Sequence, residues 1–575
     1  MNIAIIGFGP RGLSSLEQLI VEASQSNLTA LKILMFDPSD VWATGSAWDI
    51  QQPDTNRINI SDRALQDLPG REQLDFKGIT IPAFPNYTQW CKEQGVAIDK
   101  DTAKDAYPPR KQMGRYLFKR AQSIMDILMD HQVVDFIQKE IVQLDWKAPE
   151  ITLVAGDEST YTVAACVLTM GHLPLEKEER TRLHIQHAKK EQAIYIDDPY
   201  APSIMDMEVQ DQNVIVIGYG LTMIDVMRKL SSAKGGSFVK EGESLRYQFS
   251  GKEPAQLIPF SNDGLPCVAK PLGKAIDDQF TPPEALLSAY KEGLRKDIET
   301  LAEAFTLEDF TGPTASLVAS VYVKLHAAND PKEIAAQLLT WWDQRSLPAN
   351  NHLFTDPNLS AQHYLKKCIE MARGNSAFTL DYVAGQVWRQ LHPFLYEQFD
   401  HSPISAAALA ALIDLDEFMK RYTYGPPVES LLQVHELIRQ NLIAAAFLDD
   451  PELKRVSGGW ELNKGNKTVK ASILINSVLN APDMQHCSDP LIRQLFASGY
   501  VQAVHEGLGI ETLATAQVVG KEDVPLYALG RIAKGNVLGT DAILECFNRE
   551  IPRMAKAVLA RGKTRDEELG MRDGV

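Results

Sequence analysis

The chain has 575 residues, enough for several domains with a large core, and its formal net charge at pH 7 is −17. This charge argues against nucleic acids and anionic membrane surfaces as partners, because both bind basic faces. No stretch approaches the roughly 18 apolar residues of a membrane span, and the apolar start lacks the basic region of a signal peptide. The six cysteines lie far apart without a Cys-x-x-Cys pair, which disfavours zinc sites and disulfide scaffolds. We therefore predict a cytoplasmic enzyme that binds no metal, no nucleic acid and no membrane.

Residues 3–17 predict a strand, a glycine-rich turn and a helix at the start of the chain. In such a turn Gly7 lets the chain leave the strand sharply, Gly9 clears space for phosphate oxygens, and Gly12 lets the helix pack closely. The positive end of that helix then faces the pyrophosphate of a dinucleotide. The next predicted strand ends in Asp37, a carboxylate that suits an adenosine ribose. A glycine turn that serves only packing is the alternative.

A second strand, turn and helix follow in the middle of the chain, around Gly218 and Gly220, with Leu221 and Thr222 opening the helix. Met223 stands where the third glycine would be. A methionine there should hold the helix farther from the strand, so that the phosphate cradle is shallower or shifted. This turn either binds a nicotinamide nucleotide or only packs a second doubly wound unit.

Two such turns suggest the architecture of flavin enzymes, in which a unit for NAD(P)H is inserted in a unit for FAD. A predicted buried strand ending at Gly171 leads from the first unit into the inserted unit, and the chain returns to the first unit through a similar strand at 470–476. A strand ending at Gly530 completes the first unit. Between about 276 and 450 helical periodicity dominates. We predict an α/β fold of two doubly wound, Rossmann-like units, the second inserted in the first, with a helical insertion. The expected segments are 1–200 (FAD unit, first part), 201–275 (NAD(P)-binding-like unit, first part), 276–455 (helical insertion), 456–500 (return of the NAD(P)-binding-like unit) and 501–575 (closing part of the FAD unit).

With both turns placed, the chain resembles a family of bacterial FAD/NAD(P)-binding proteins that includes aspartate N-monooxygenases and FAD-dependent urate hydroxylases. The likeness covers most of the chain except parts of the helical insertion. The opening turn carries a Pro-Arg pair typical of the family, Pro10 and Arg11, and 45–59 resembles the segment that brings a loop toward the flavin. The blocks 109–117 and 250–266 are similar as well.

The resemblance implies FAD contacts by Pro10, Arg11 and Gly45, and it puts Asn59 beside the flavin ring as the catalytic hydrogen-bond donor. A loop-capping asparagine is the alternative. Relatives commonly carry two arginines where this chain has Asn262 and Asp263. An acid there repels a 2′-phosphate, so the expected cofactors are FAD with either NADH or NADPH.

The predicted function is a FAD-dependent oxidoreductase, an NAD(P)H-dependent monooxygenase that hydroxylates a small amine, amino acid or heterocycle with molecular oxygen through a flavin hydroperoxide. Such chemistry asks little of acid or base side chains, because the cofactor performs the difficult step. One alternative is a flavin reductase or dehydrogenase without oxygen insertion. Another is a catalytically degenerate dinucleotide-binding protein, which Met223 and Asp263 would favour. Neither the substrate nor the oligomeric state follows from the sequence.

Overall fold

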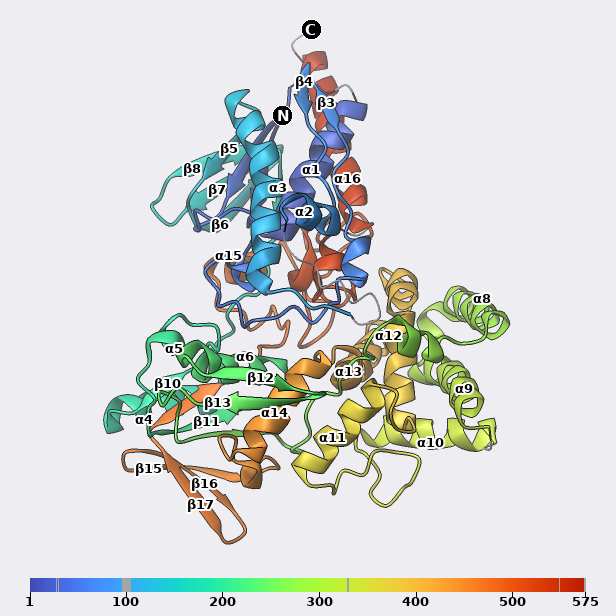
Figure 1. Ribbon diagram of the computed structural model, residues 1–575. Coiled ribbons are helices and arrows are strands. Elements are labelled where there is room, and N and C mark those ends of the chain that lie inside the picture. Colours follow the sequence, from blue (N-terminus) through green and yellow to red (C-terminus); the bar gives the residue numbers. More distant parts are fainter. Residues whose placement is uncertain (27, 29, 96–104, 328–329, 548, 573–575) are drawn as a thin grey trace.

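The computed structural model describes residues 1–26, 28, 30–95, 105–327, 330–547 and 549–572. The lobe that holds both termini contains a five-stranded parallel sheet with strand order β19-β9-β1-β2-β5 (Figure 1). The other lobe contains a four-stranded parallel sheet with strand order β10-β18-β11-β14. All four strands of the second sheet lie between β9 and β19 in the chain, so the second unit is inserted in the first. The predicted α/β fold is thereby confirmed.

The first sheet consists of β1 (Asn2–Ile6), β2 (Lys32–Phe36), β5 (Val134–Ile137), β9 (Ala165–Leu168) and β19 (Leu526–Ala528). The second sheet consists of β10 (Ile194–Ile196), β11 (Asn213–Ile217), β14 (Gln256–Phe260) and β18 (Ile473–Asn476). Strands β1 and β9 are almost wholly buried, as parallel strands covered on both faces must be. Because β10 precedes residue 200, the second sheet takes its edge strand from the range expected for the first unit.

Short antiparallel strands form the smaller sheets, namely β3 (Leu74–Phe76), β4 (Ile79–Ile81), β6 (Ile141–Lys147), β7 (Glu150–Ala155), β8 (Thr160–Val163), β12 (Ser237–Glu241), β13 (Ser244–Gln248), β15 (Glu452–Val456), β16 (Gly459–Lys464) and β17 (Lys467–Ala471). The helices outside the insertion are α1 (Pro10–Gln25), α2 (Tyr87–Glu93), α3 (Arg110–Asp130), α4 (Glu179–Glu191), α5 (Ser203–Asp206), α6 (Leu221–Leu230), α7 (Lys274–Asp277), α15 (Pro490–Ser498) and α16 (Glu550–Arg572).

In both units the parallel sheet has helices on one face and a three-stranded antiparallel sheet on the other. Neighbouring residues of a strand point to opposite faces. In β1, Ile5 packs with α1, α3 and α16, whereas Ile6 packs with β6, β7 and β8. In β11, Val216 packs with α6 and the helical insertion, whereas Ile215 packs with β15, β16 and β17. The two units therefore bury their sheets in the same way.

The helical insertion runs between β14 and β18 and comprises α8 (Glu284–Leu301), α9 (Leu307–His326), α10 (Pro331–Gln344), α11 (Ala361–Ala372), α12 (Leu380–Phe399), α13 (Ala406–Thr423) and α14 (Val428–Arg439). It also reaches the closing segment of the first unit. The His401 N–H donates to the Asn536 carbonyl oxygen, and the Leu538 N–H donates to Asp400 Oδ1, each at 2.8 Å. The insertion thus touches both units. Among the described helices, none is long and apolar enough to cross a membrane.

Candidate functional site

Three strands of the first sheet lead into glycines at the same edge. Gly7 follows β1, Gly171 comes soon after β9, and Gly530 comes soon after β19. Their φ angles are 94°, 69° and 81°, which side chains other than glycine rarely adopt. In open α/β sheets, ligands bind at the carboxyl ends of the parallel strands. These turns therefore mark one end of the candidate site.

In the first glycine turn there is no room for a side chain at Gly7 or Gly12, but there is room at Gly9. A Cβ on Gly7 would lie 2.7 Å from the Thr169 carbonyl oxygen, and a Cβ on Gly12 would lie 2.4 Å from the Gly7 carbonyl oxygen. A Cβ on Gly9 would meet nothing within 4 Å. The space beside Gly9 faces the N-terminal end of α1, where backbone N–H groups favour an anion. This open cradle fits the pyrophosphate of a dinucleotide.

Two predicted residues shape the turn itself. Pro10 is the first residue of α1, where its fixed φ suits the helix and its missing N–H costs nothing. Asp37 follows β2, and its Oδ2 accepts a hydrogen bond from the Phe8 N–H at 2.6 Å. Its Oδ1 accepts from the Ser39 N–H at 2.8 Å. The carboxylate thus braces the turn, and its role toward a ribose stays a prediction.

Arg11 and Gly45 bring two distant segments to the first turn. Arg11 Nη1 donates to the Thr540 carbonyl oxygen at 3.1 Å. A Cβ on Gly530 would lie 2.6 Å from Arg11 Cδ, so a larger residue there would displace the Arg11 side chain. A Cβ on Gly45 would lie 3.8 Å from Gly9 Cα. The structure therefore brings these predicted residues together around the open cradle.

The second glycine turn repeats this geometry. The Gly218 N–H donates to the Phe260 carbonyl oxygen at 2.8 Å. The φ of Gly218 is 106°, and a Cβ there would lie 2.6 Å from Ser477 Oγ. A Cβ on Gly220 would meet only Cys267 Sγ, at 4.0 Å. The second unit thus presents a second open cradle at the N-terminal end of α6.

The start of α6 explains how a methionine replaces the third glycine. Leu221 and Thr222 are the first residues of the helix. Met223 is 3% exposed and packs in the large core that the second unit shares with the helical insertion. The first hydrogen bond of the helix, from the Ile224 N–H to the Gly220 carbonyl oxygen, is 3.4 Å long. Met223 therefore points into the core and not into the cradle.

Asp263, the acid expected to disfavour a 2′-phosphate, lies after β14. Its Oδ2 accepts a hydrogen bond from Arg421 of α13, and its Oδ1 accepts from the Leu265 N–H at 3.1 Å. The arginine forms an ion pair with this carboxylate. The acid therefore holds a cation of the helical insertion in place.

Asn59 lies where the first unit, the second unit and the helical insertion meet. Its Nδ2 donates to the Tyr424 carbonyl oxygen at 3.4 Å, next to the end of α13. The main-chain carbonyl oxygen of Asn59 accepts a hydrogen bond from Lys270 Nζ at 2.5 Å. Asn59 thus contacts the helical insertion through its side-chain amide and Lys270 through its main-chain carbonyl group, and its catalytic role stays a prediction. Burial, reinforced by repulsion from Arg389, lowers the pKa of Lys270 to about 7.

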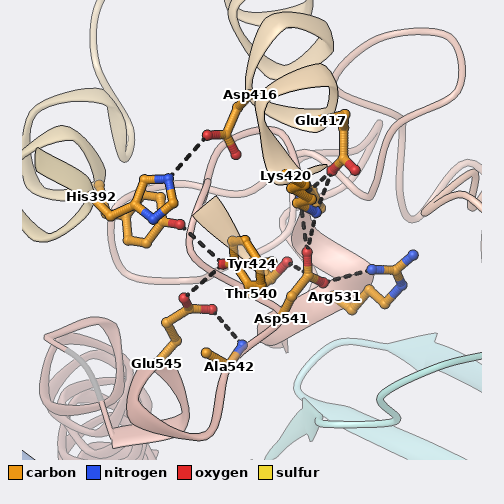
Figure 2. Close-up of polar contacts among 12 residues, drawn as sticks. His392, Asp416, Glu417, Lys420, Tyr424, Arg531, Thr540, Asp541, Ala542 and Glu545 are labelled. Atoms are coloured by element: carbon orange, nitrogen blue, oxygen red, sulfur yellow. Dashed lines mark hydrogen bonds and ion pairs between the residues drawn. The ribbon is translucent and has the colours of Figure 1, made fainter. Parts of the chain in front are cut away.

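A network of charged side chains, with Lys534 buried and the others partly or largely exposed, joins α13 to the closing segment of the first unit (Figure 2). Asp541 accepts hydrogen bonds from Arg531 Nη1 at 2.6 Å, Lys420 Nζ at 2.7 Å and Lys534 Nζ at 3.1 Å. Glu417 Oε1 accepts from the two lysines at 2.6 and 2.9 Å. Although burial opposes ionisation, these cations hold the pKa of Asp541 well below its usual range.

A second branch of the network contains tyrosines, a histidine and carboxylates (Figure 2). Tyr424 Oη donates to Glu545 Oε1 at 3.5 Å and lies 3.2 Å from Tyr396 Oη. His392 Nε2 and Asp416 Oδ1 are 3.3 Å apart. Burial raises the pKa of Glu545. Together the two branches fix the helical insertion against the segment that approaches Arg11.

Sequence reasoning missed Lys270, Tyr424 and the network around Asp541. Lys270 follows the recognised block 250–266, but its partner Asn59 lies 211 residues earlier in the chain. Lys420 and Asp541 are 121 residues apart. Neither pair forms a spacing pattern, so the periodicity of the sequence could not have revealed them.

Comparisons with known proteins show what this chain is similar to. Residues 4–173 match the model of a family described as FAD-NAD(P)-binding. The chain is 25% identical over 564 residues to a nitrosuccinic acid synthase of Aspergillus oryzae, which covers 89% of this chain and 83% of that protein. It is 23% identical over 571 residues to an L-aspartate N-monooxygenase (nitrosuccinate-forming) of Streptomyces cremeus, with 87% and 83% covered. Among solved structures, the reduced form of ornithine hydroxylase from Pseudomonas aeruginosa aligns with 97% of this chain and 99% of that chain, at 12% identity and a TM-score of 0.49.

The family match and the relatives confirm three predictions. The chain is similar to aspartate N-monooxygenases, its cofactors are FAD and a nicotinamide nucleotide, and it is a flavin-dependent oxidoreductase of the monooxygenase class. The likeness to urate hydroxylases stays a prediction. A small-molecule substrate and molecular oxygen are the partners that accompany this class.

Proposed function

We propose that this chain hydroxylates the amine of a small dicarboxylic amino acid, with L-aspartate as the first candidate. The observation that carries the proposal is the pair of open cradles beside Gly9 and Gly220, one at the carboxyl edge of each parallel sheet. Two cradles suit two dinucleotides, which is what a flavin monooxygenase that uses NADH or NADPH requires. The relatives named for aspartate chemistry match 87–89% of the chain, which supports the same class of substrate.

FAD, when bound, would accept electrons from the nicotinamide nucleotide and transfer one oxygen atom from molecular oxygen to the substrate. The residues proposed to hold its pyrophosphate and ribose are Gly7, Gly9, Pro10, Arg11, Gly12 and Asp37. Those proposed to border the flavin are Gly45, Gly171 and Gly530. Those proposed to hold the nicotinamide nucleotide are Gly218, Gly220, Leu221 and Thr222. All but Gly45 stand near the carboxyl ends of the parallel strands or at the start of the helix that follows, and Gly45 lies in a loop beside Gly9.

Asn59 is proposed as the hydrogen-bond donor to the reacting group. The bond from its Nδ2 to Tyr424 is long, at 3.4 Å, and an amide nitrogen carries a second N–H. The neighbouring tyrosines and the tightly packed closing segment would limit the entry of water. We further propose the cytoplasm as the location, because all six cysteines are free thiols and five of them are buried.

The test begins with the absorbance spectrum of the purified protein, followed without oxygen while NADH or NADPH is added. Air and L-aspartate are then supplied, and the products are analysed by mass spectrometry, with succinate as the matched compound that lacks an amine. We expect a yellow protein, bleaching by a nicotinamide nucleotide, and an N-oxygenated product from L-aspartate alone.

Two results would contradict the proposal. A colourless protein that cannot be reconstituted with FAD would exclude the cofactor assignment. Rapid flavin reduction and oxygen consumption that yield only hydrogen peroxide with every amino acid tried would favour a reductase without oxygen insertion.

A further inference from the structure

Lys270 connects the two nucleotide-binding units through its ammonium group. It lies on the segment that follows β14 of the second unit. Its Nζ donates a hydrogen bond to the main-chain carbonyl oxygen of Asn59 in the first unit at 2.5 Å. An ammonium group has three N–H donors. Within the described part of the chain, the Asn59 oxygen is the one acceptor that Nζ contacts, so two donors are open to a ligand.

The charged side chains around Lys270 neutralise one another without the charge of the lysine. Arg63 Nη2 lies 3.0 Å from Asp105 Oδ2 and 3.0 Å from Asp277 Oδ2, and Arg389 forms an ion pair with the other oxygen of Asp277. Two arginines thus compensate two aspartates. Among the described residues, no carboxylate forms an ion pair with Lys270 Nζ. The lysine therefore adds a positive charge that the protein itself does not neutralise directly.

The surroundings make this charge costly. Burial is the main reason that the pKa of Lys270 falls to about 7, and repulsion from Arg389 adds to it, while Asp277 and Asp105 partly oppose the shift. Tyr107, which faces the same arginines and aspartates, stays uncharged because burial raises its pKa. An anion beside Nζ would offset both the burial and the repulsion.

We infer that Lys270 binds a carboxylate of the substrate at the junction of the two units, on the side where Asn59 stands. The inference deepens the proposed function and rests on it, since it assigns one carboxylate of a dicarboxylic amino acid to this lysine. A phosphate of the nicotinamide nucleotide is the competing ligand, because Lys270 follows the same strand as Asp263.

The inference predicts a pH dependence with a definite sign. The free lysine loses its proton as the pH rises through about 7, whereas an anion binds the protonated form. The dissociation constant should be flat below that pH and rise about tenfold per pH unit above it, with uptake of a proton on binding. Succinate is a suitable probe, because both of its carboxyls are ionised at pH 7 and above, where the change is expected, and it has no amine to titrate.

The experiment is a calorimetric titration of the FAD-loaded protein with succinate and with L-aspartate between pH 6 and pH 9. Lys270→Met removes the charge at similar length and should weaken succinate binding at pH 6 by about 10- to 100-fold, as the loss of a charge-assisted hydrogen bond does. It should also abolish the pH dependence. Lys270→Arg should bind with an affinity that no longer changes with pH. Lys252→Met, at an exposed lysine of the same unit, is the matched control and should behave as the unchanged protein does.

The fold of the variant can be checked independently. Removing a partly buried lysine of lowered pKa relieves the cost of desolvating its charge, so Lys270→Met should unfold at the same or a higher temperature at pH 6. A normal flavin spectrum and normal reduction by NADH or NADPH would show that both cofactor sites are intact.

The outcomes separate the inference from the proposed function. Unchanged succinate binding by Lys270→Met, or no succinate binding by the unchanged holoenzyme, would overturn the inference. A loss of NADPH affinity with unchanged succinate affinity would assign the lysine to the nucleotide. If the unchanged protein binds both dicarboxylates with the expected pH dependence but forms no N-oxygenated product, the carboxylate site stands and the proposed function fails.

Discussion

The two glycine turns begin with the same backbone arrangement. Gly7 donates its N–H to the Phe36 carbonyl oxygen, and Gly218 donates to the Phe260 carbonyl oxygen, both at 2.8 Å. In the first unit Thr169, just after β9, donates its hydroxyl hydrogen to the Gly7 carbonyl oxygen. In the second unit Ser477, just after β18, donates to the Ile217 carbonyl oxygen. The two turns differ at the third position of the motif, which is Gly12 in the first turn and Met223 in the second.

The third position sets how closely the helix approaches. At Gly12 there is no room for a Cβ, which would lie 2.4 Å from the Gly7 carbonyl oxygen. At Met223 a full side chain is accommodated in the core, and the first hydrogen bond of α6 is 3.4 Å long against 3.0 Å in α1. Strand pairing therefore places both turns alike, while the third residue distinguishes how the two helices begin. We expect the tight turn to retain its dinucleotide and the looser turn to exchange it.

The largest effect is expected from Gly9→Ala. The φ of Gly9 is −82°, which alanine adopts freely, and the new Cβ would meet no protein atom within 4 Å. The free energy of unfolding of the apoprotein should change by less than about 0.5 kcal/mol. FAD binding should weaken at least about 100-fold, because the methyl group occupies the space that phosphate oxygens need. The flavin-to-protein ratio after purification measures this, with Gly293→Ala on α8 as the control, and a variant that keeps its flavin would refute the assignment of the cradle.

Met223→Ala tests whether the methionine belongs to the core or to the ligand site. We expect a loss of about 2–5 kcal/mol in the free energy of unfolding, because a buried side chain is replaced by a cavity. The KM for the nicotinamide nucleotide should stay nearly constant. Chemical denaturation and steady-state kinetics check the two parts, and a changed KM with unchanged stability would place the side chain in the cradle.

Gly220→Ala is the counterpart of Gly9→Ala in the second unit. Its φ of −101° also suits alanine, and the nearest atom to the new Cβ would be Cys267 Sγ at 4.0 Å. FAD content should be normal, while the KM for NADH or NADPH should rise by about 10- to 50-fold, equivalent to about 1.4–2.3 kcal/mol. Stopped-flow reduction of the flavin measures this directly. Equal loss of both cofactors would show that the two cradles are not independent.

The smallest effect is expected from Asp263→Ala. The substitution releases Arg421 from its ion pair, so that its guanidinium becomes available to a 2′-phosphate. The ratio of kcat/KM for NADPH to that for NADH should rise by up to about tenfold, or about 1.4 kcal/mol. Asp449→Ala, which breaks the nearby ion pair with Lys464, serves as the control. A ratio that moves toward NADH would mean that Arg421 does not face the nucleotide.

Local features of the chain were enough to predict the two strand-turn-helix units and their order. Apolar runs, helical spacing and glycines whose φ values are positive act over a few residues, so they can be read without the fold. The same local reading identified Met223 as the departure in the second turn, although it could not show that this side chain packs inward. Asp37 illustrates the limit, since its position was predicted but its bonds to Phe8 and Ser39 were not.

What the sequence by itself determined is therefore the kind of fold, the location of both glycine turns and the class of cofactor. Only the tertiary structure decided which distant residues surround them. Arg11 reaches Thr540 across 529 residues of chain, and Lys270 reaches Asn59 across 211. The physical reason is that such contacts arise when whole units pack together, and no short-range spacing in the chain records which side chains will then be buried side by side.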